Sequence, residues 1–454
     1  MKKKMRIFAC AMAFFLLAAT IAGCADTSGN GEASPGIVDS PSADAGASAE
    51  SSPDMGNLAE QTNIRFPKRE LGGNKNITVM VMGEDDWLRA ATSVYQAEYG
   101  GTVSFVSVAW DMRITRLRQY VMSGDSPDYV SVFGVDILSM MFQDLLTPIG
   151  DLIDLENENL RIDAMKKLAS YKGNIYGFAP VPQKEQDELE QSPLVMIYNN
   201  NLFRRASLKT PLEYYNEGNW TWEVFLDLAR KITEKDNSGQ TTTYGFAGSY
   251  DEAFIISNGV PPASYENDTV TLNLNNNESR AAFDIVHDMV ADGVSPLERW
   301  DGYALFLGGN LAMYHAWPNE VGNYISSGMD VDFVPFPKGP AADNHYSLGD
   351  FSFYAVPMGA KNVEGGLAFC EILANGFPNL EREKRPFTEE QKERMSDIAS
   401  SIKDGGFILG NSGPLAAEWN QLYYSLRLNP VGTALESELP ALNNALNTFL
   451  SIRK

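Results

Sequence analysis

Strand-like and helix-like segments alternate from residue 77 onwards, and this alternation constrains the fold more than any other feature of the sequence. Residues 77–82 are rich in β-branched and long apolar side chains, which predicts a strand. Residues 87–99 carry apolar side chains at helical spacing and precede two glycines, which predicts a helix and its end. Strands at 103–108 and 129–133, with a helix over 111–122 between them, continue the pattern. Such alternation predicts parallel β-α units and an α/β fold.

The length of the chain predicts more than one folded body. About 390 of the 454 residues lie beyond residue 62, whereas single hydrophobic cores stop growing near roughly 250–300 residues. Amphipathic patterns predict helices at 222–232 and 279–290, and a mostly helical segment from residue 387 to the C-terminus. We therefore expect two lobes.

The N-terminal residues have the layout of a cleavable export signal. Three lysines and one arginine lie within the first six residues, residues 7–21 are almost uninterrupted apolar sequence, and small residues precede Cys24. This layout resembles a bacterial lipoprotein signal, in which cleavage precedes a lipid-carrying cysteine. The apolar run of about 15 residues is short for a spanning helix, which needs roughly 20. An ordinary secretory signal with an incidental cysteine and an uncleaved anchor are the alternatives.

The next segment predicts a tether. Residues 25–61 are rich in Ser, Ala, Gly, Pro and Asp and carry few large apolar side chains, so they cannot bury enough surface to fold. We thus expect a signal peptide at 1–23 and a lipidated Cys24 with a disordered tether over 24–62. The folded part is then held at the outer face of the cell membrane.

Charge and cysteine content exclude several classes of protein. The formal net charge of −23 disfavours nucleic acid as a partner, because phosphate binding needs clustered Lys and Arg. Cys370 is the one cysteine beyond the tether, so no disulfide forms within the folded part, and its apolar helical surroundings predict a buried side chain. Three scattered histidines make a zinc site improbable, and we expect no cofactor.

Several local motifs occur in one order along the chain. They are Trp110-Asp111, 123–130 (SGDSPDYV), 146–149 (LTPI), 171–180 (YKGNIYGFAP), 196–203 (MIYNNNLF), Thr210-Pro211, 219–223 (NWTWE), 306–313 (FLGGNLAM) and Trp317. Together they resemble the family 1 extracellular solute-binding proteins, the sugar-binding lipoproteins of ABC importers that are related to the maltose-binding protein. The resemblance runs from about residue 75 to 375.

The resemblance implies a type II periplasmic-binding-protein-like fold, in which two α/β lobes are joined by a hinge and bind ligand in the cleft between them. The first lobe would comprise 75–182 with 340–375, and the second 190–335 with 380–454. Chain crossings near 180–193 and 336–346 are the expected hinge segments.

The candidate ligand-binding residues are aromatic and acidic side chains at expected strand ends. Aromatic faces stack on sugar rings, and carboxylates accept hydroxyl hydrogen bonds more strongly than neutral groups do. Family resemblance favours Trp317, with Tyr314 second, although a buried interdomain tryptophan is the alternative; for most of the others a structural role is equally open. The full set is Trp317, Trp110, Asp111, Asp86, Trp87, Phe133, Asp136, Tyr314, Asp350, Phe351 and Trp300.

The sequence thus predicts a monomeric carbohydrate-binding lipoprotein that delivers its ligand to an ABC permease and is not an enzyme. A surface-anchored carbohydrate-active enzyme is one alternative, although no glycosidase, nucleophile-elbow, phosphate-loop or metalloprotease motif accompanies the acids. A ligand-presenting partner of a sensor kinase is another. Within transport, few basic residues at the expected strand ends favour a neutral glycan over an anionic solute.

Overall fold

A computed structural model describes residues 65–181, 191–266, 269–298, 301–377, 386–402 and 415–451. The predicted signal peptide, the lipidation site Cys24 and the tether lie outside these residues, as does Trp300. Among the helices in the described ranges, none combines the length and apolar character needed to cross a bilayer.

The first sheet confirms the predicted β-α units. Its described strands lie in the order β2-β1-β3-β14-β6, with β1 parallel to β2 and to β3. They are β1 (Ile77–Val81), β2 (Val103–Ser107), β3 (Tyr129–Phe133), β14 (Gly349–Ala355) and β6 (Gln191–Pro193). β14 runs antiparallel to both β3 and β6, so the sheet is mixed rather than wholly parallel.

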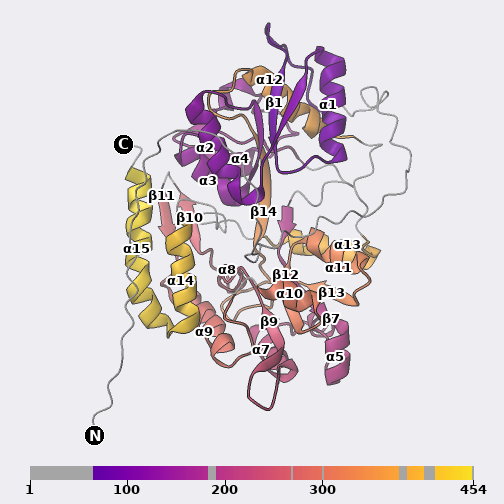
Figure 1. The fold of residues 1–454 in the computed structure, drawn as a ribbon, viewed down its shortest axis with the longest axis vertical. Helices are drawn as coiled ribbons and strands as arrows, with labels where there is room; N and C mark the ends of the chain where they lie inside the picture. The colour runs from indigo at the N-terminus through magenta and orange to yellow at the C-terminus, as the bar shows by residue number, and fades with distance from the viewer. Residues whose placement is uncertain are drawn as a thin grey trace, which may run out of the picture. The chain divides into compact units, whose positions relative to one another are not determined.

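Helices connect and cover the strands of this sheet. Helices α1 and α12 pack against each other and beside β1 (Figure 1), and α12 also contacts β3 and β14. The helix predicted at 111–122 is observed as α2 (Arg113–Ser123), which ends where Gly124 adopts φ 75° at its C-cap. The elements are α1 (Asp86–Tyr99), η2 (Trp110–Met112), α2 (Arg113–Ser123), α3 (Gly134–Phe142), η3 (Gly150–Leu152), α4 (Ile162–Leu168), the hairpin β4 (Ser170–Tyr171) and β5 (Asn174–Ile175), and α12 (Val363–Asn375).

The two expected hinge segments lead to neighbouring strands of this sheet. β6 belongs to the 180–193 segment, of which residues 182–190 lie outside the described part, and β14 follows the 336–346 segment. The strands pair in the register Gly349↔Pro193 and Asp350↔Ser192, and Leu194 N–H donates to the carbonyl of Leu348 at 2.7 Å. The end of the first crossing is therefore hydrogen-bonded to β14, the strand that follows the second crossing.

The second sheet follows directly from β6. Its described strands lie in the order β13-β7-β12-β9-β8: β13 (Val331–Val334), β7 (Val195–Asn199), β12 (Leu311–Ala316), β9 (Thr241–Ala247) and β8 (Glu234–Lys235). Every residue of β7 and β12 is buried. Val195 and Ile197 pack in one apolar cluster and Met196 and Tyr198 in another, as the two-residue period of a strand requires.

Helices cover both faces of the second sheet, and a helical tail completes the fold. They are α5 (Asn200–Ala206), α6 (Pro211–Asn216), α7 (Trp222–Ile232), α8 (Glu252–Ser257), α9 (Asn277–Ala291), α10 (Gly302–Leu307) and α11 (Pro318–Ser326), with the hairpin β10 (Ala263–Glu266) and β11 (Thr269–Leu272). The tail comprises α13 (Glu389–Ser400), α14 (Ala416–Leu428) and α15 (Val431–Ser451), which confirms its predicted helical character. In it, α14 and α15 pack on each other and on α9.

Two local expectations differ from the structure. In the 306–313 motif, the sequence of the Gly308-Gly309 pair predicts close approach of a helix and a strand, but a Cβ on Gly309 would meet nothing within 4 Å, and the residue serves a turn at φ 71°. Asp350 was expected in a loop after a strand, but it lies within β14.

Candidate functional site

Trp110 and Phe133 meet at the carboxyl ends of β2 and β3. Trp110 lies in η2, directly after β2, and Phe133 is the last residue of β3. Their ring centroids lie 4.6 Å apart at an interplanar angle of 60°, yet Trp110 keeps 52 % of its surface exposed. β2 and β3 lie parallel on either side of β1, so their carboxyl ends bring these residues to one edge of the sheet, where ligands of open α/β sheets bind. Asp111 is exposed beside them.

A buried ion pair lies beneath Trp110. The guanidinium carbon of Arg113 is 4.1 Å from the centroid of the Trp110 ring. Arg113 also donates from Nε and Nη2 to the two carboxylate oxygens of Asp136, at 2.6 and 2.9 Å. Burial raises the pKa of Asp136, and the charge and hydrogen bonds of Arg113 oppose that rise. Asp136 has no exposed surface, so the carboxylate that the sequence placed among ligand contacts binds an arginine instead.

At the second sheet, Trp317 follows β12 and begins α11. It is half-buried, its Nε1 donates to the hydroxyl of Tyr250 at 3.4 Å, and the two rings pack edge to face with centroids 5.7 Å apart. The backbone N–H of Trp317 donates to Glu320 Oε2 at 2.7 Å, which fixes the start of α11. Burial raises the pKa of Glu320, and this hydrogen bond opposes the rise. The ring of Trp317 thus lies at a strand end, as predicted, with Tyr250 as a partner.

The loop that carries Tyr250 is held by two buried side chains. His315, in β12, accepts from the backbone N–H groups of Ser249 and Tyr250 through Nε2. Arg427, in α14, donates to both carboxylate oxygens of Asp251 at 2.7 and 2.8 Å and to the carbonyl of Gly248 at 2.9 Å. The arginine and Asp251 side chains are each 2 % exposed. Residues 248–251 are therefore fixed on both sides.

Other predicted site residues lie elsewhere or are covered. Trp87 is 8 % exposed and packs edge to face on Phe377, and Tyr314 and Phe351 are also buried. Asp86 is exposed on the first turn of α1 and pairs with Arg89. For Asp350 the structure describes only the backbone. The rings brought together at strand ends are thus Trp110 with Phe133, and Trp317 with Tyr250.

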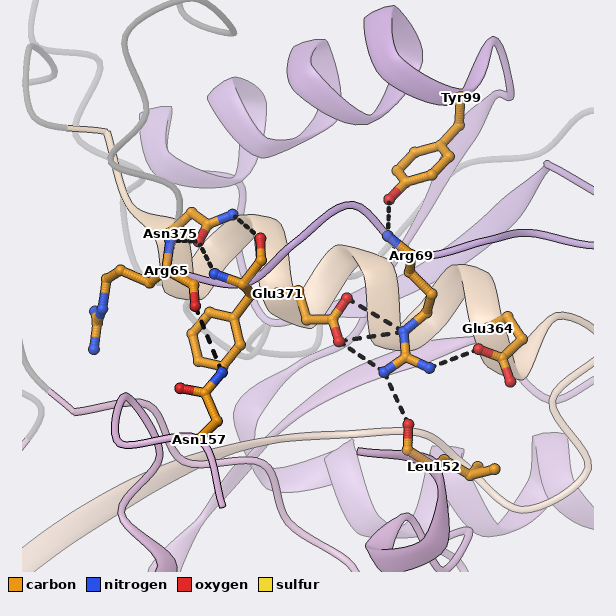
Figure 2. Close-up of polar contacts among 9 residues, drawn as sticks. Arg65, Arg69, Tyr99, Leu152, Asn157, Glu364, Glu371 and Asn375 are labelled. Carbon is orange, nitrogen blue, oxygen red and sulfur yellow. Dashed lines mark hydrogen bonds and ion pairs between the residues drawn. The ribbon is translucent and has the colours of Figure 1, made fainter. Parts of the chain in front are cut away.

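A third arginine cluster lies where the chain enters the first sheet. We call residues 65–70 the arm. Asn375 Oδ1 accepts from the backbone N–H groups of Arg65 and Phe66 at 2.8 Å, and Arg69 pairs with Glu371 and Glu364 of α12 at 2.7 Å each. Figure 2 shows these contacts converging on α12. The two glutamates are seven residues apart and thus share one helix face.

The arm also forms one wall of a cavity of about 280 Å³. Apolar side chains line much of it, among them Phe66, Ile153, Leu160 and Phe178.

Within the described ranges, no group of three or more His, Cys, Asp or Glu is placed to hold a metal ion. The buried Cys370 side chain confirms the sequence prediction, and burial raises the pKa of its thiol.

Sequence reasoning missed Arg113, Tyr250, Asp251, His315 and Arg427. Arg113 shares the buried face of its helix with Ile114 and Leu117, and a charged residue within an apolar stripe was the available signal for a buried partner. Arg427 gives the same signal beside Tyr423 and Leu426. No local pattern marks Tyr250, because its neighbours come from strands and helices distant in sequence.

With the fold and strand ends in place, comparison with known proteins identifies the class. Residues 81–375 match the bacterial extracellular solute-binding protein family. The match spans more than half of the chain, so the chain belongs to this family of binding proteins, and the predicted resemblance is confirmed. No curated protein sequence gives a significant match.

Solved structures show the same fold. The ABC substrate-binding protein Lmo0181 from Listeria monocytogenes, solved in complex with cycloalternan, aligns with a TM-score of 0.63 at 16 % identity over 82 % of this chain and 99 % of that chain. The galacto-N-biose/lacto-N-biose I-binding protein of Bifidobacterium longum, in complex with lacto-N-biose, gives 0.61 at 16 % over 84 % and 99 %. The Thermus thermophilus maltotriose-binding protein, bound with maltotriose, gives 0.58 at 18 % over 82 % and 100 %. The predicted type II periplasmic-binding-protein-like α/β fold is thereby confirmed.

Proposed function

We propose that this solute-binding protein captures a neutral mono- or oligosaccharide between two α/β lobes and delivers it to the permease of an ABC importer. The observation that carries the proposal is Trp110, a ring held at a strand end with 52 % of its surface exposed. Each of the three similar structures named above holds a bound carbohydrate.

The chemistry of the strand ends suits a sugar. The C–H faces of a pyranose pack on aromatic rings, and its hydroxyls donate to carboxylates. Trp110 with Phe133 supplies one ring surface, Trp317 with Tyr250 a second, and the exposed carboxylate of Asp111 an acceptor. Asp86, Asp350 and Trp300 stay predicted contacts from neighbouring segments. In the described conformation, Trp87, Tyr314 and Phe351 are too buried to offer a ring face.

Delivery of the ligand to a permease requires a conformational change that ligand binding can drive. We assign the first lobe to 75–182 with 340–375 and the second to 190–335 with 380–454, and the hinge to the two crossings near 180–193 and 336–346. A ligand that contacts both lobes favours the closed state by its differential affinity for that state. The pairing of β6 with β14 supports a common hinge, because the first crossing is hydrogen-bonded to the strand that follows the second.

The proposed setting is the outer face of the cell membrane. Lipid at Cys24 and the tether would hold a monomeric binding protein close to its permease, with ATP hydrolysed by a separate cytoplasmic subunit. The basic start, apolar core and cysteine of the signal support this assignment. No cofactor enters the proposed cycle.

A glycan panel tests the proposal. Thermal-shift measurements on the full-length chain with neutral mono- and oligosaccharides should raise the melting temperature for at least one sugar, because that ligand binds the native state. Trp110→Ala and Trp317→Ala should each weaken this sugar by about tenfold or more in calorimetry. Met122→Ala is the matched control, since Met122 is an 80 % exposed apolar side chain at the far end of α2.

Three results would count against it. Equal affinity in the wild type and both tryptophan variants would remove the assigned ring surfaces. Binding restricted to anionic or cationic solutes would change the ligand class. Turnover of a bound glycan would point to the enzymatic alternative.

A further inference from the structure

Trp110 combines large exposure with unusually specific support. An exposed tryptophan ordinarily samples several rotamers, and ordering it on binding costs free energy. Here the ring contacts a guanidinium and a phenylalanine ring at centroid distances of 4.1 and 4.6 Å. The ring is therefore packed against two side chains of the protein itself.

The guanidinium beneath the ring is itself fixed. Arg113 and Asp136 side chains are 4 % and 1 % exposed, and their two parallel N–H···O bonds allow one relative orientation. Arg113 Nη1 also donates to the backbone carbonyl of Trp110 at 2.5 Å. The Arg113 side chain thus contacts both the ring and the backbone of Trp110.

The position of this arginine in the chain explains why the support is needed. The turn from β2 into α2 lacks a side-chain cap, since neither Ala109 nor Met112 makes a capping hydrogen bond. Arg113 is the first residue of α2, and Asp136 lies in the first turn of α3. The ion pair therefore joins the two strand-end turns that carry Trp110 and Phe133.

We propose that Arg113 and Asp136 are positioning residues that preorganise Trp110 as the sugar-stacking surface. The inference rests on the proposed function for its ligand. Arg113 and Asp136 act on the ligand through Trp110, because both are buried beneath the ring. The sequence placed Asp136 among direct ligand contacts. In this proposal Asp136 affects ligand binding indirectly, by fixing Arg113 beneath the Trp110 ring.

The first test needs no ligand. Incorporation of 5-fluorotryptophan labels the seven tryptophans of the chain, and Trp110→Phe assigns the resonance of Trp110. The apolar double variant Arg113→Met with Asp136→Leu removes both charges together, which avoids leaving one unpaired and buried. In this variant the ¹⁹F resonance of Trp110 should move towards the value of free, solvated fluorotryptophan while the other six keep their positions. Arg113→Lys should give an intermediate shift, because lysine cannot form the bidentate pair.

The second test uses the sugar found on the panel. Trp110→Ala and the double variant should weaken binding by similar factors, about tenfold. Adding the double variant to Trp110→Ala should cause no further loss, because residues that act through the same ring are not additive. A merely structural pair would instead lower the melting temperature without this coupling.

The outcomes separate the two proposals. An unchanged Trp110 resonance in the double variant overturns the positioning role, whether or not a sugar binds. A full additional loss of affinity in the triple variant does so too. Absence of any binding by the wild type contradicts the proposed function, while the fluorine shift still decides whether Arg113 holds the ring.

Discussion

The strand ends of the two sheets hold their aromatic rings by different means. At the first sheet, Arg113 contacts the Trp110 ring directly and pairs with Asp136 beneath it. At the second sheet, Arg427 and Asp251 form an equally buried pair, but together with His315 they bind the backbone of residues 248–251. One charged side chain supports the Trp110 ring, beside its contact with Phe133, whereas several side chains hold the loop that carries Tyr250. The comparison predicts that Trp110 is the more easily released by a single substitution.

The largest effect is expected from breaking either buried pair. Arg113→Met and Arg427→Met each leave an unpaired buried carboxylate, so each should lower the free energy of unfolding by about 3–5 kcal/mol in urea titrations. Arg89→Met, which breaks an exposed pair of α1, is the control and should change it by at most about 0.5 kcal/mol. Only the Arg113 substitution should also shift the Trp110 fluorine resonance. A shift from both would erase the distinction between the two sheets.

The arm offers an arginine that lies at neither strand end. Arg69 bridges Glu364 and Glu371 of α12 and donates to the carbonyl of Leu152 at 2.9 Å. Arg69→Met should cost about 1.5–3 kcal/mol of unfolding free energy, since it removes charged hydrogen bonds that are partly exposed. Sugar affinity at 25 °C should stay within twofold of the wild type. Loss of sugar affinity in Arg69→Met would mean that any destabilisation of the protein impairs binding. Weaker binding after substitution of Arg113 would then not support a positioning role for that residue.

The loop at the second sheet is tested by crowding its backbone. A Cβ on Gly248 would come within 2.5 Å of the His315 ring, so Gly248→Ala should lower the free energy of unfolding by about 1–3 kcal/mol. Gly72→Ala is the matched control, because a Cβ there meets nothing within 4 Å. Thermal denaturation of the pair measures the difference. Equal stability would show that the loop is less tightly held than its hydrogen bonds indicate.

The smallest effect is expected from the titration of His345, which lies in the chain between β13 of the second sheet and β14 of the first. Burial lowers the pKa of His345, with a further contribution from Lys338, while its hydrogen bond to the carbonyl of Phe336 opposes the change. The folded state therefore favours the neutral ring. Stability should be full above the ordinary histidine pKa of about 6.5 and decline as the pH falls through it. His345→Gln should reduce that decline between pH 7 and pH 5; an identical slope would exclude His345 as its source.

Local sequence patterns were sufficient for most elements. The strand predicted at 129–133 and the helix predicted at 222–232 coincide with β3 and α7, because apolar periodicity and end signals are local. The Thr221 side chain caps α7 by accepting from the backbone N–H of Val224. The pairing of β14 with β3 and β6 could not be predicted from such patterns, since it joins segments more than 150 residues apart.

Local sequence patterns predicted only part of the candidate site. Trp110 and Phe133 lie at the carboxyl ends of two parallel strands, β2 and β3, so their place at one edge of the sheet could be expected from the β-α pattern. The burial of Asp136 could not, because an acid at a strand end has the same local pattern whether it faces a ligand or an arginine. Only the three-dimensional structure shows that Asp136 is paired with Arg113, 23 residues earlier in the chain.

The arm has a mechanical consequence. Arg65 is the first residue that the structure describes, and its backbone and that of Phe66 are bonded to the last residue of α12, which packs on the first sheet. Any pull transmitted from the N-terminal end therefore reaches the first sheet and its helices and bypasses the strands of the second. With the proposed lipid at Cys24, this attachment would keep the first of the two proposed lobes close to the membrane and leave the second free to rotate about the proposed hinge.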